Sequence, residues 1–279
     1  MSAPYEHLPG NSKPNRRYAA LVLAGRRSPD DPLAAVTGAP HRALLDIHGR
    51  PMLERVLRTL LEIPCIEQIS ISIDEPELLE RESTLEQLLS QQESRLLAHR
   101  SAASPSRSVL AALDELPADQ PLLVTTADHA LLTREMVEHF LARTEDAGAD
   151  VGVGLVAEQL LCARFPDAQR TYLAFRGERY SGANLFAFTS AEARRAALFW
   201  TRAEQFRKKP WRLVSVFGPI TLALFLARRL DLRAAFERAS RVIGTRVEPV
   251  EMPWAEAAVD VDKLSDLELV LRILDRAED

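Results

Sequence analysis

Three aspartates stand directly after apolar runs in this sequence, and carboxylates in such positions are suited to binding a divalent cation. Asp128 follows Pro121–Ala127, and Asp260 and Asp262 follow a run of small apolar residues. If the chain between Asp260 and Asp262 is extended, both carboxylates point to one side, because side chains alternate along such a segment. Mg²⁺ prefers oxygen ligands and usually takes one or two carboxylates together with substrate phosphates. The pattern indicates a magnesium site.

Each of these positions also has an ordinary structural interpretation. Asp128 suits a turn or the first turn of a helix, and Asp260 and Asp262 suit a turn before the last predicted helix. The recurrence of aspartates at the ends of apolar runs favours metal binding over either interpretation taken alone.

A second group of candidates lies where an apolar run near the start of the chain breaks off. Ala19–Leu23 is typical of a buried strand, and the run stops at Ala24 and Gly25, with Arg26 and Arg27 directly after. Ligands bind in loops at the carboxyl ends of strands in open α/β sheets. Guanidinium groups match the geometry of phosphate oxygens. The loop therefore predicts a phosphate site, with two solvated arginines as the alternative.

Two further stretches are candidates for binding a second substrate. Lys208 and Lys209 end a long predicted helix that starts at Ser190, and they suit either a phosphate or the helix C-terminus. Gly182 lets a ligand approach the backbone and Asn184 can hydrogen-bond it, although a plain turn explains them equally well.

Several other kinds of site are excluded by the sequence. The six histidines form no pair at metal-binding helical spacing, and Cys65 and Cys162 have no zinc-like spacing. No Gly-x-Ser-x-Gly elbow and no Walker or Rossmann glycine pattern occurs. A net charge of −5 gives no general attraction to nucleic acid, so we expect no nucleic-acid partner.

The ends and the apolar stretches of the chain indicate a cytoplasmic protein. Met1–Arg17 is polar, lacks the apolar core of a signal peptide and suits a disordered leader. The two separated cysteines suit reduced thiols. Leu213–Ala227 is the longest apolar stretch, and it is too short to span a bilayer, so we expect no transmembrane segment. A homodimer is compatible with the sequence.

Strands and helices alternate over the first half of the chain, which predicts parallel β-α units and an α/β fold. We expect one domain over residues 18–279, with a helical elaboration at 189–242 on the acceptor side. The predicted strands are 19–23, 66–73, 121–127, 151–157, 171–176, 183–189 and 245–252. The predicted helices are 51–63, 76–97, 108–116, 133–147, 190–208, 221–229, 232–242 and 265–276, and a polar loop is predicted at 99–107.

Five motifs in this order resemble the MobA-like NTP transferases, the nucleotidyltransferase superfamily that includes molybdenum cofactor guanylyltransferase and methylerythritol phosphate cytidylyltransferase. They are Leu23-Ala24-Gly25, Arg42-Ala43-Leu44-Leu45, Gly49-Arg50-Pro51-Met52-Leu53, Asp128, and Asp262-Lys263-Leu264-Ser265-Asp266-Leu267. The resemblance covers about residues 18 to 275. It implies a GT-A-like, Rossmann-type α/β/α sandwich with a mostly parallel mixed sheet.

The resemblance also implies roles for individual residues. An NTP would react with a phosphorylated acceptor to release pyrophosphate, with Mg²⁺ held by Asp128 and Asp262 or Asp260. The stretch Ser104–Val109 is similar to the Arg-x-x-Ser-Val segment of the cytidylyltransferase branch, which favours CTP slightly over GTP. The implied nucleotide-binding residues are Leu23, Ala24, Gly25, Arg26, Arg27, Ser104, Ser108 and Asp128; Arg26 and Arg42 are the implied catalytic residues, and Gly182, Asn184, Lys208 and Lys209 the acceptor-binding ones.

The sequence departs from the family pattern at three places. Arg26 stands where a second glycine is usual, Arg42 where a lysine is usual, and Asp128-His129-Ala130 replaces an Asp-x-Pro pattern. Two other functions stay open. One is a GT-A glycosyltransferase that uses Asp260-Val261-Asp262 as its metal motif, and the other is a nucleotide-binding protein without turnover.

Overall fold

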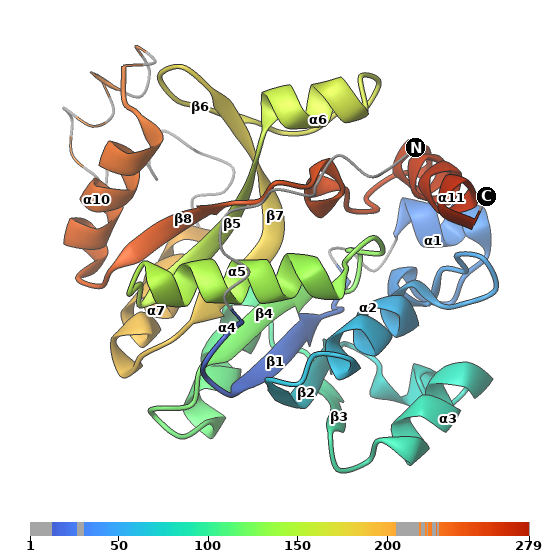
Figure 1. Cartoon of the computed structure of the whole chain (residues 1–279). Helices are drawn as coiled ribbons and strands as arrows, with labels where there is room; N and C mark the ends of the chain where they lie inside the picture. The colour runs from blue at the N-terminus through green and yellow to red at the C-terminus, as the bar shows by residue number, and fades with distance from the viewer. Residues whose placement is uncertain are drawn as a thin grey trace.

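All eight strands that the structure describes form one mixed sheet (Figure 1). The computed structural model describes residues 13–26, 31–204, 218, 221, 223–224, 227 and 229–278. The strand order is β3-β2-β1-β4-β7-β5-β8, and the short β6 pairs with β7. The strands are β1 (Tyr18–Leu23), β2 (Ile66–Ile73), β3 (Leu96–Arg100), β4 (Leu122–Thr126), β5 (Val151–Ala157), β6 (Leu173–Ala174), β7 (Arg179–Phe188) and β8 (Val247–Glu251).

The central strands β1 and β4 run parallel and end side by side. β1 pairs in parallel with β2 and β4, whereas β7 runs antiparallel to β4 and β5. Leu23 lies opposite Thr126, and the amide of Ala127 donates to the carbonyl of Leu23 at 3.0 Å. The loops that follow β1 and β4 therefore leave the same edge of the sheet at the same point.

Helices cover both faces of the sheet, so the molecule has three layers (Figure 1). Apolar side chains of α2, α3, α5 and α6 pack on one face, and those of α4, α7 and α10 pack on the other. The helices are α1 (Pro32–Thr37), α2 (Met52–Leu61), α3 (Ser83–Gln91), α4 (Pro105–Glu115), α5 (Arg134–Asp146), α6 (Glu158–Arg164), α7 (Arg194–Glu204), α10 (Leu232–Ile243) and α11 (Leu264–Glu278). The arrangement confirms the predicted α/β/α fold with a mostly parallel mixed sheet.

A separate apolar cluster anchors the end of the chain beside the start of the domain. Leu33 of α1 and Met52 of α2 pack with Val259, Val261 and Val270. This cluster brings the segment before α11 against elements more than 200 positions earlier in the sequence. Residues 259–262 are therefore fixed by packing at the edge where β1 and β4 end.

The predicted helix over residues 76–97 is only partly confirmed. The structure has the 3₁₀ turn Pro76–Leu78, helix α3 and then the strand β3. Ile69 of β2 pairs with Leu96, so β3 is an edge strand of the sheet. Leu96 is the only buried residue of β3. The sequence of this strand therefore has no alternating apolar pattern that would distinguish it from a helix.

Other element boundaries also differ from the predicted ones. Helix α4 starts at Pro105 rather than at 108, because Ser104 caps it by accepting a hydrogen bond from the amide of Arg107. The predicted strands at 171–176 and 183–189 form a hairpin, but β7 already begins at Arg179, so Gly182 lies inside a strand instead of a turn. Helices α1 and α6 were not predicted.

The remaining predicted elements match the structure within a few residues, apart from two predicted helices that include residues outside the described ranges. Of the predicted helix at 190–208, residues 205–208 lie outside the described residues. The predicted helix at 221–229 also lies partly outside them. Of the predicted leader, residues 13–17 are described, and the amide of Asn15 donates to Glu145 of α5 at 2.7 Å. Within the described ranges, no helix is both long enough and apolar enough to cross a membrane.

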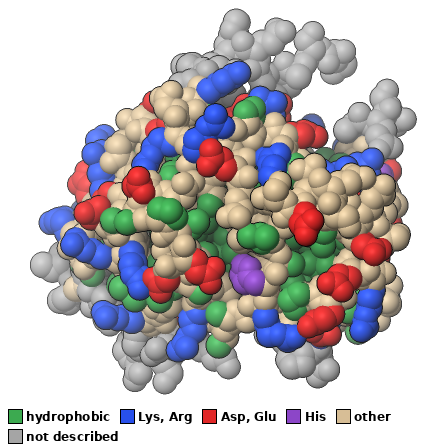
Figure 2. All heavy atoms as spheres, turned by 90° about the horizontal axis from the view of Figure 1, so that it is seen from below, with side chains coloured by type: hydrophobic (Ala, Val, Ile, Leu, Met, Phe, Trp, Pro, Cys, Tyr) green, Lys and Arg blue, Asp and Glu red, His purple; other side chains and the backbone are tan. Residues whose placement is uncertain are grey.

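Charged side chains of both signs share the surface. On the face seen in Figure 2, basic and acidic side chains of the described residues are interspersed, and neither sign forms a broad patch there.

Gly152 of β5 sets how closely α5 packs on the sheet. A Cβ at this position would lie 2.8 Å from Thr144 Cγ2, and Thr144 is fully buried on α5. We predict that Gly152→Ala lowers the free energy of unfolding by about 1–3 kcal/mol, because overpacking displaces α5. Urea unfolding measures the loss. Gly182→Ala is the matched control, since a Cβ there has no atom within 4 Å, and equal losses for both variants would contradict the packing explanation.

Candidate active site

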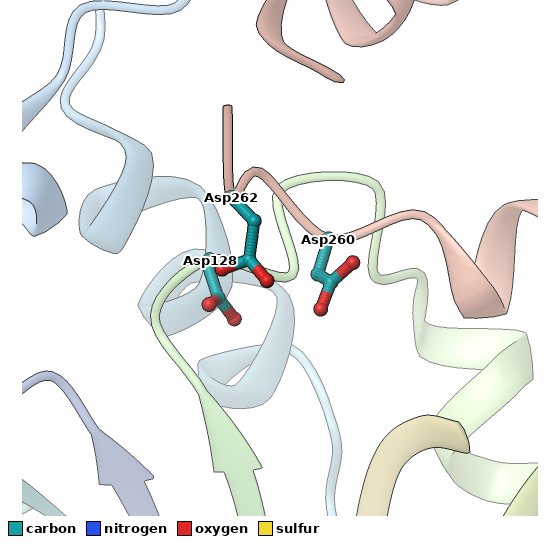
Figure 3. Close-up of side chains that lie close together, drawn as sticks. All are labelled: Asp128, Asp260 and Asp262. Atoms are coloured by element: carbon teal, nitrogen blue, oxygen red, sulfur yellow. The ribbon is translucent and has the colours of Figure 1, made fainter. Parts of the chain in front are cut away.

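Three carboxylates converge at the edge where β1 and β4 end. Asp128 follows β4, and Asp260 and Asp262 lie on the segment before α11. One oxygen from each lies within 4.8 Å of the others. Figure 3 shows the side chains from the two segments directed into a common space. The structure thus brings together the three aspartates predicted as metal ligands.

Burial of the alternating valines explains why Asp260 and Asp262 face the same way. Val259 and Val261 are both 0% exposed, and each packs into the apolar cluster with α1 and α11. Side chains alternate along this extended segment, so the aspartates between and after the valines turn out of the cluster. The amide of Val261 also donates to the carbonyl of Asp128 at 3.0 Å, which ties the two acidic segments together.

Arg42 joins the cluster to the start of α1. Its Nη1 donates to Asp262 Oδ1 at 2.9 Å and its Nε donates to Asp31 Oδ2 at 2.7 Å. Asp31 is buried and also caps α1 by accepting hydrogen bonds from the amides of Leu33 and Ala34. Burial acts to raise the pKa of Asp31, but these amides and Arg42 outweigh it and lower that pKa. Asp31 is therefore a charged anchor for Arg42.

The other carboxylate of the pair, Asp260, has two partners of its own. Arg170 Nη1 donates to Asp260 Oδ1 at 2.8 Å, and Asn184 Nδ2 donates to Asp260 Oδ2 at 3.1 Å. Asn184 adopts a left-handed backbone conformation with φ of 50°. Burial is the largest influence and raises the pKa of Asp260, with Arg170 lowering it and Asp262 raising it further.

The loop after β1 lines a small cavity next to the carboxylates. Leu23, Ala24, Gly25 and Arg26 share this cavity with Asp128, and Asp31, His41, Arg42, Ala43, Met52 and Ala127 complete its lining. The structure therefore places the predicted nucleotide loop, Arg42 and Asp128 around one space. Arg27, Lys208 and Lys209 lie outside the described residues.

Arg26 is held by acidic groups at the end of β2. Its amide donates to Asp74 Oδ1 at 2.9 Å, its Nη2 lies 3.0 Å from Glu75 Oε1, and the same nitrogen donates to the carbonyl of Pro40. These contacts fix both the backbone and the side chain of Arg26. Nothing in the sequence pattern pointed to Asp74, which lies 48 positions away.

His41 supports the same carboxylate. It is 1% exposed, and its Nδ1 accepts a hydrogen bond from the amide of Ala43, so a neutral ring carries its proton on Nε2. That nitrogen lies 3.1 Å from Asp74 Oδ1 and donates to it. Burial lowers the pKa of His41, although Asp74 partly opposes this. Burial acts to raise the pKa of Asp74, but hydrogen bonds from Arg26 and His41 outweigh it and lower that pKa.

Comparison with known proteins decides the family. Residues 20–208 match the profile of the MobA-like NTP transferase domain. The chain belongs to this family. It is therefore a nucleotidyltransferase, as the order of its motifs predicted. No curated protein matches the chain significantly.

Solved structures share the fold of this MobA-like domain. A hypothetical transferase from Thermus thermophilus is 28% identical, with a TM-score of 0.73 over 90% of this chain and 99% of that one. A CMP:2-keto-3-deoxy-manno-octonic acid synthetase complexed with CTP is 14% identical, with a TM-score of 0.57 over 94% and 99%. A 4-diphosphocytidyl-2C-methyl-D-erythritol synthase from Anaerococcus prevotii is 12% identical, with a TM-score of 0.54 over 94% and 99%.

The serines of the predicted base-binding loop are engaged within the MobA-like domain. Ser104 caps α4, and the buried hydroxyl of Ser108 accepts hydrogen bonds from Ser72 Oγ and from the amide of Ala102, each at 3.0 Å. A Cβ on Gly25 would lie 3.3 Å from Ser101 Oγ, so this loop lies against the loop after β1. Neither serine lines the cavity, and their nucleotide-binding role stays a prediction.

His129 directly follows Asp128 and makes the domain sensitive to acid. Complete burial lowers its pKa to about 4, from about 6.5 in an unfolded chain. The folded state thus prefers the neutral ring, and stability is full above pH 6.5 and falls as the pH drops from about 6.5 towards 4. The loss amounts to about 2 kcal/mol at pH 5.

We predict that His129→Gln flattens this part of the profile of unfolding free energy against pH. Chemical unfolding at several pH values between 7 and 4.5 measures it, with His99→Gln on β3 as the control. A variant profile as steep as that of the wild type would show that other groups cause the acid sensitivity.

Proposed function

We propose that this nucleotidyltransferase moves an NMP from an NTP, with CTP slightly favoured over GTP, to a small phosphorylated acceptor in a Mg²⁺-dependent reaction. The observation that carries the proposal is the convergence of Asp128, Asp260 and Asp262 beside the loop after β1. Phosphoryl-type transfer requires mainly positioning and neutralisation of negative charge, and this arrangement offers groups for both.

The donor set fits a hard divalent cation. Three carboxylate groups lie close together, and carboxylate oxygen is the ligand type that Mg²⁺ prefers. We assign Asp128 and Asp262 as the ligands, with Asp260 as the third candidate, because Arg170 and Asn184 already occupy both oxygens of Asp260. When bound, the cation supplies positive charge beside the reacting phosphate.

The chain's own residues bind and orient the triphosphate. Residues 23–26 form the loop that lines the cavity at the carboxyl end of a central strand, where phosphates commonly bind. Arg26 is fixed at one end of this loop by Asp74 and Glu75. Arg42 places a guanidinium next to Asp262, so it can donate to a phosphate oxygen that approaches the same space.

Arg42 performs this role differently from a lysine. Its planar fork bridges Asp31 and Asp262 through two different nitrogens, whereas a lysine ammonium is a compact point charge without that fork. Asp31 and Arg42 therefore form a matched pair in this chain. This arrangement supports retained phosphate binding despite the departure from the usual lysine.

Separate observations support the nucleotide preference and the acceptor side of the site. The similarity of Ser104–Val109 to a cytidylyltransferase segment and a CTP complex among the structural neighbours favour CTP. Asn184 of β7 lies on the Asp260 side of the site, because it bonds Asp260 directly, and Gly182 comes two residues earlier in the same strand. We assign them, with Lys208 and Lys209, to the phosphorylated acceptor.

Pyrophosphate release tests this proposal. Each of the four NTPs is incubated with Mg²⁺ and a panel of sugar, polyol and other small phosphates, and pyrophosphate is measured by a coupled enzyme assay. We predict release with at least one pairing, with CTP giving the highest rate. Binding of NTP without any release would support a nucleotide-binding protein instead, and release of a nucleoside diphosphate from an NDP-sugar would support a glycosyltransferase.

Variants connect this activity to the site. Asp128→Asn and Asp262→Asn should each lower kcat by about 100-fold or more, because each removes a charge that positions the cation. Asp275→Asn is the matched control, since Asp275 is an exposed residue of α11. Full activity in both site variants would show that the carboxylate cluster is not the catalytic centre.

A further inference from the structure

Arg170 is a buried cation between α6 and β6 that none of the recognised motifs contains. Its side chain is 6% exposed. A guanidinium at this depth is costly to bury unless anionic partners compensate for its lost hydration. Its partners are two acidic residues, Asp260 on the segment that leads into α11 and Asp266 in the first turn of that helix.

The guanidinium holds Asp260 at two points. Nη1 donates to the carboxylate oxygen Oδ1 at 2.8 Å, and Nη2 donates to the backbone carbonyl of the same residue at 3.1 Å. Arg170 thus fixes the side-chain rotamer and the peptide orientation of Asp260 together. Asn184 holds the second carboxylate oxygen, so Asp260 has little freedom to rotate away from the cluster.

Asp266 extends this control to Asp262. Arg170 Nη1 lies 3.3 Å from Asp266 Oδ1, and Asp266 is itself 4% exposed. The other oxygen of Asp266 accepts hydrogen bonds from the amides of Asp262 and Lys263, each at 3.1 Å. The backbone of Asp262 is therefore fixed by a carboxylate that Arg170 orients and neutralises.

Arg170 also acts on the cluster through its positive charge. Asp128, Asp260 and Asp262 have oxygens within 4.8 Å of one another, so their charges repel unless cations compensate. Arg42 offsets the charge of Asp262, and Arg170 offsets that of Asp260. The positive charge of Arg170 lets Asp260 remain within the cluster. The hydrogen bonds that Arg170 donates determine where the Asp260 carboxylate lies.

We infer that Arg170 is a positioning residue of the metal site: by holding Asp260 directly and Asp262 through Asp266, it fixes the segment that places Asp262 opposite Asp128 in the arrangement that binds the divalent cation. The inference rests on the proposed function, because it takes the carboxylate cluster to be the cation site. Arg170 itself does not contact the substrates in this account.

Mn²⁺ binding to the full chain tests the role without relying on turnover. Binding is measured in the absence of nucleotide by the EPR signal of free Mn²⁺, for the wild type, Arg170→Met, Arg170→Lys and Asp262→Asn. Arg164→Met is the matched control, because Arg164 is a 60% exposed arginine of α6 whose partner is Glu256 rather than a cluster carboxylate.

We expect Arg170→Met to raise the Kd for Mn²⁺ by about 10–100-fold, the size of effect usual for residues that orient metal ligands. Arg170→Lys should fall between Arg170→Met and the wild type, since lysine keeps the charge but loses the fork that grips Asp260 at two points. Arg164→Met should bind as the wild type does. High Mn²⁺ should raise the Tm of the wild type more than that of Arg170→Met, which a loss of general stability alone would not produce.

The outcomes separate the inference from the proposed function. Wild-type affinity in Arg170→Met, together with lost affinity in Asp262→Asn, would overturn the role of Arg170 and leave the cation site intact. Mn²⁺ binding that Asp262→Asn does not weaken would overturn the cation site and the inference together. If Arg170→Met does not fold, Arg170→Lys decides, and wild-type affinity in that variant would overturn the inference.

Discussion

The repulsion between three closely placed carboxylates is the constraint to which much of the surrounding structure responds. Asp128, Asp260 and Asp262 approach within 4.8 Å, and such a cluster persists only where packing holds the backbone and cations offset the charge. The buried valines on either side of Asp260 hold one segment, and the parallel sheet holds the other. Arg42 and Arg170 supply the compensating charge from two different parts of the chain.

The sheet brings these parts together. Because β1 and β4 are parallel neighbours that pair Leu23 with Thr126, the loop after β1 and the first carboxylate start from the same edge. β7 lies on the other side of β4 and carries Asn184 to the same region. The site is therefore assembled from loops whose starting points are fixed by strand pairing, and side-chain contacts refine the positions.

The sequence predicted the parts of this site that have a local pattern. The alternation of apolar and acidic residues around Val261 predicted two carboxylates on one side, and an apolar run that ends at Gly25 predicted a strand and its loop. Arg170, Asp74 and His41 had no such pattern, because their partners lie 90, 48 and 33 positions away. Only the folded chain shows which partner each of them faces.

For a related reason, the sequence predicted the central strands better than the edge strand and the short helices. Central strands such as β4 are buried along their length and leave a continuous apolar run. The edge strand β3 is mostly solvent-accessible, so its residues resemble those of a charged helix or loop. Helices α1 and α6 are 6 and 7 residues long, which is too short for helical periodicity to separate them from loops.

The most direct measurement is a crystal structure with Mn²⁺ and a non-hydrolysable CTP analogue, in which the anomalous signal locates the ion. The account predicts an ion between the carboxylates of Asp128 and Asp262, with the triphosphate over residues 23–26 and in contact with Arg42. An ion bound away from these aspartates, or a triphosphate that avoids the loop after β1, would contradict it.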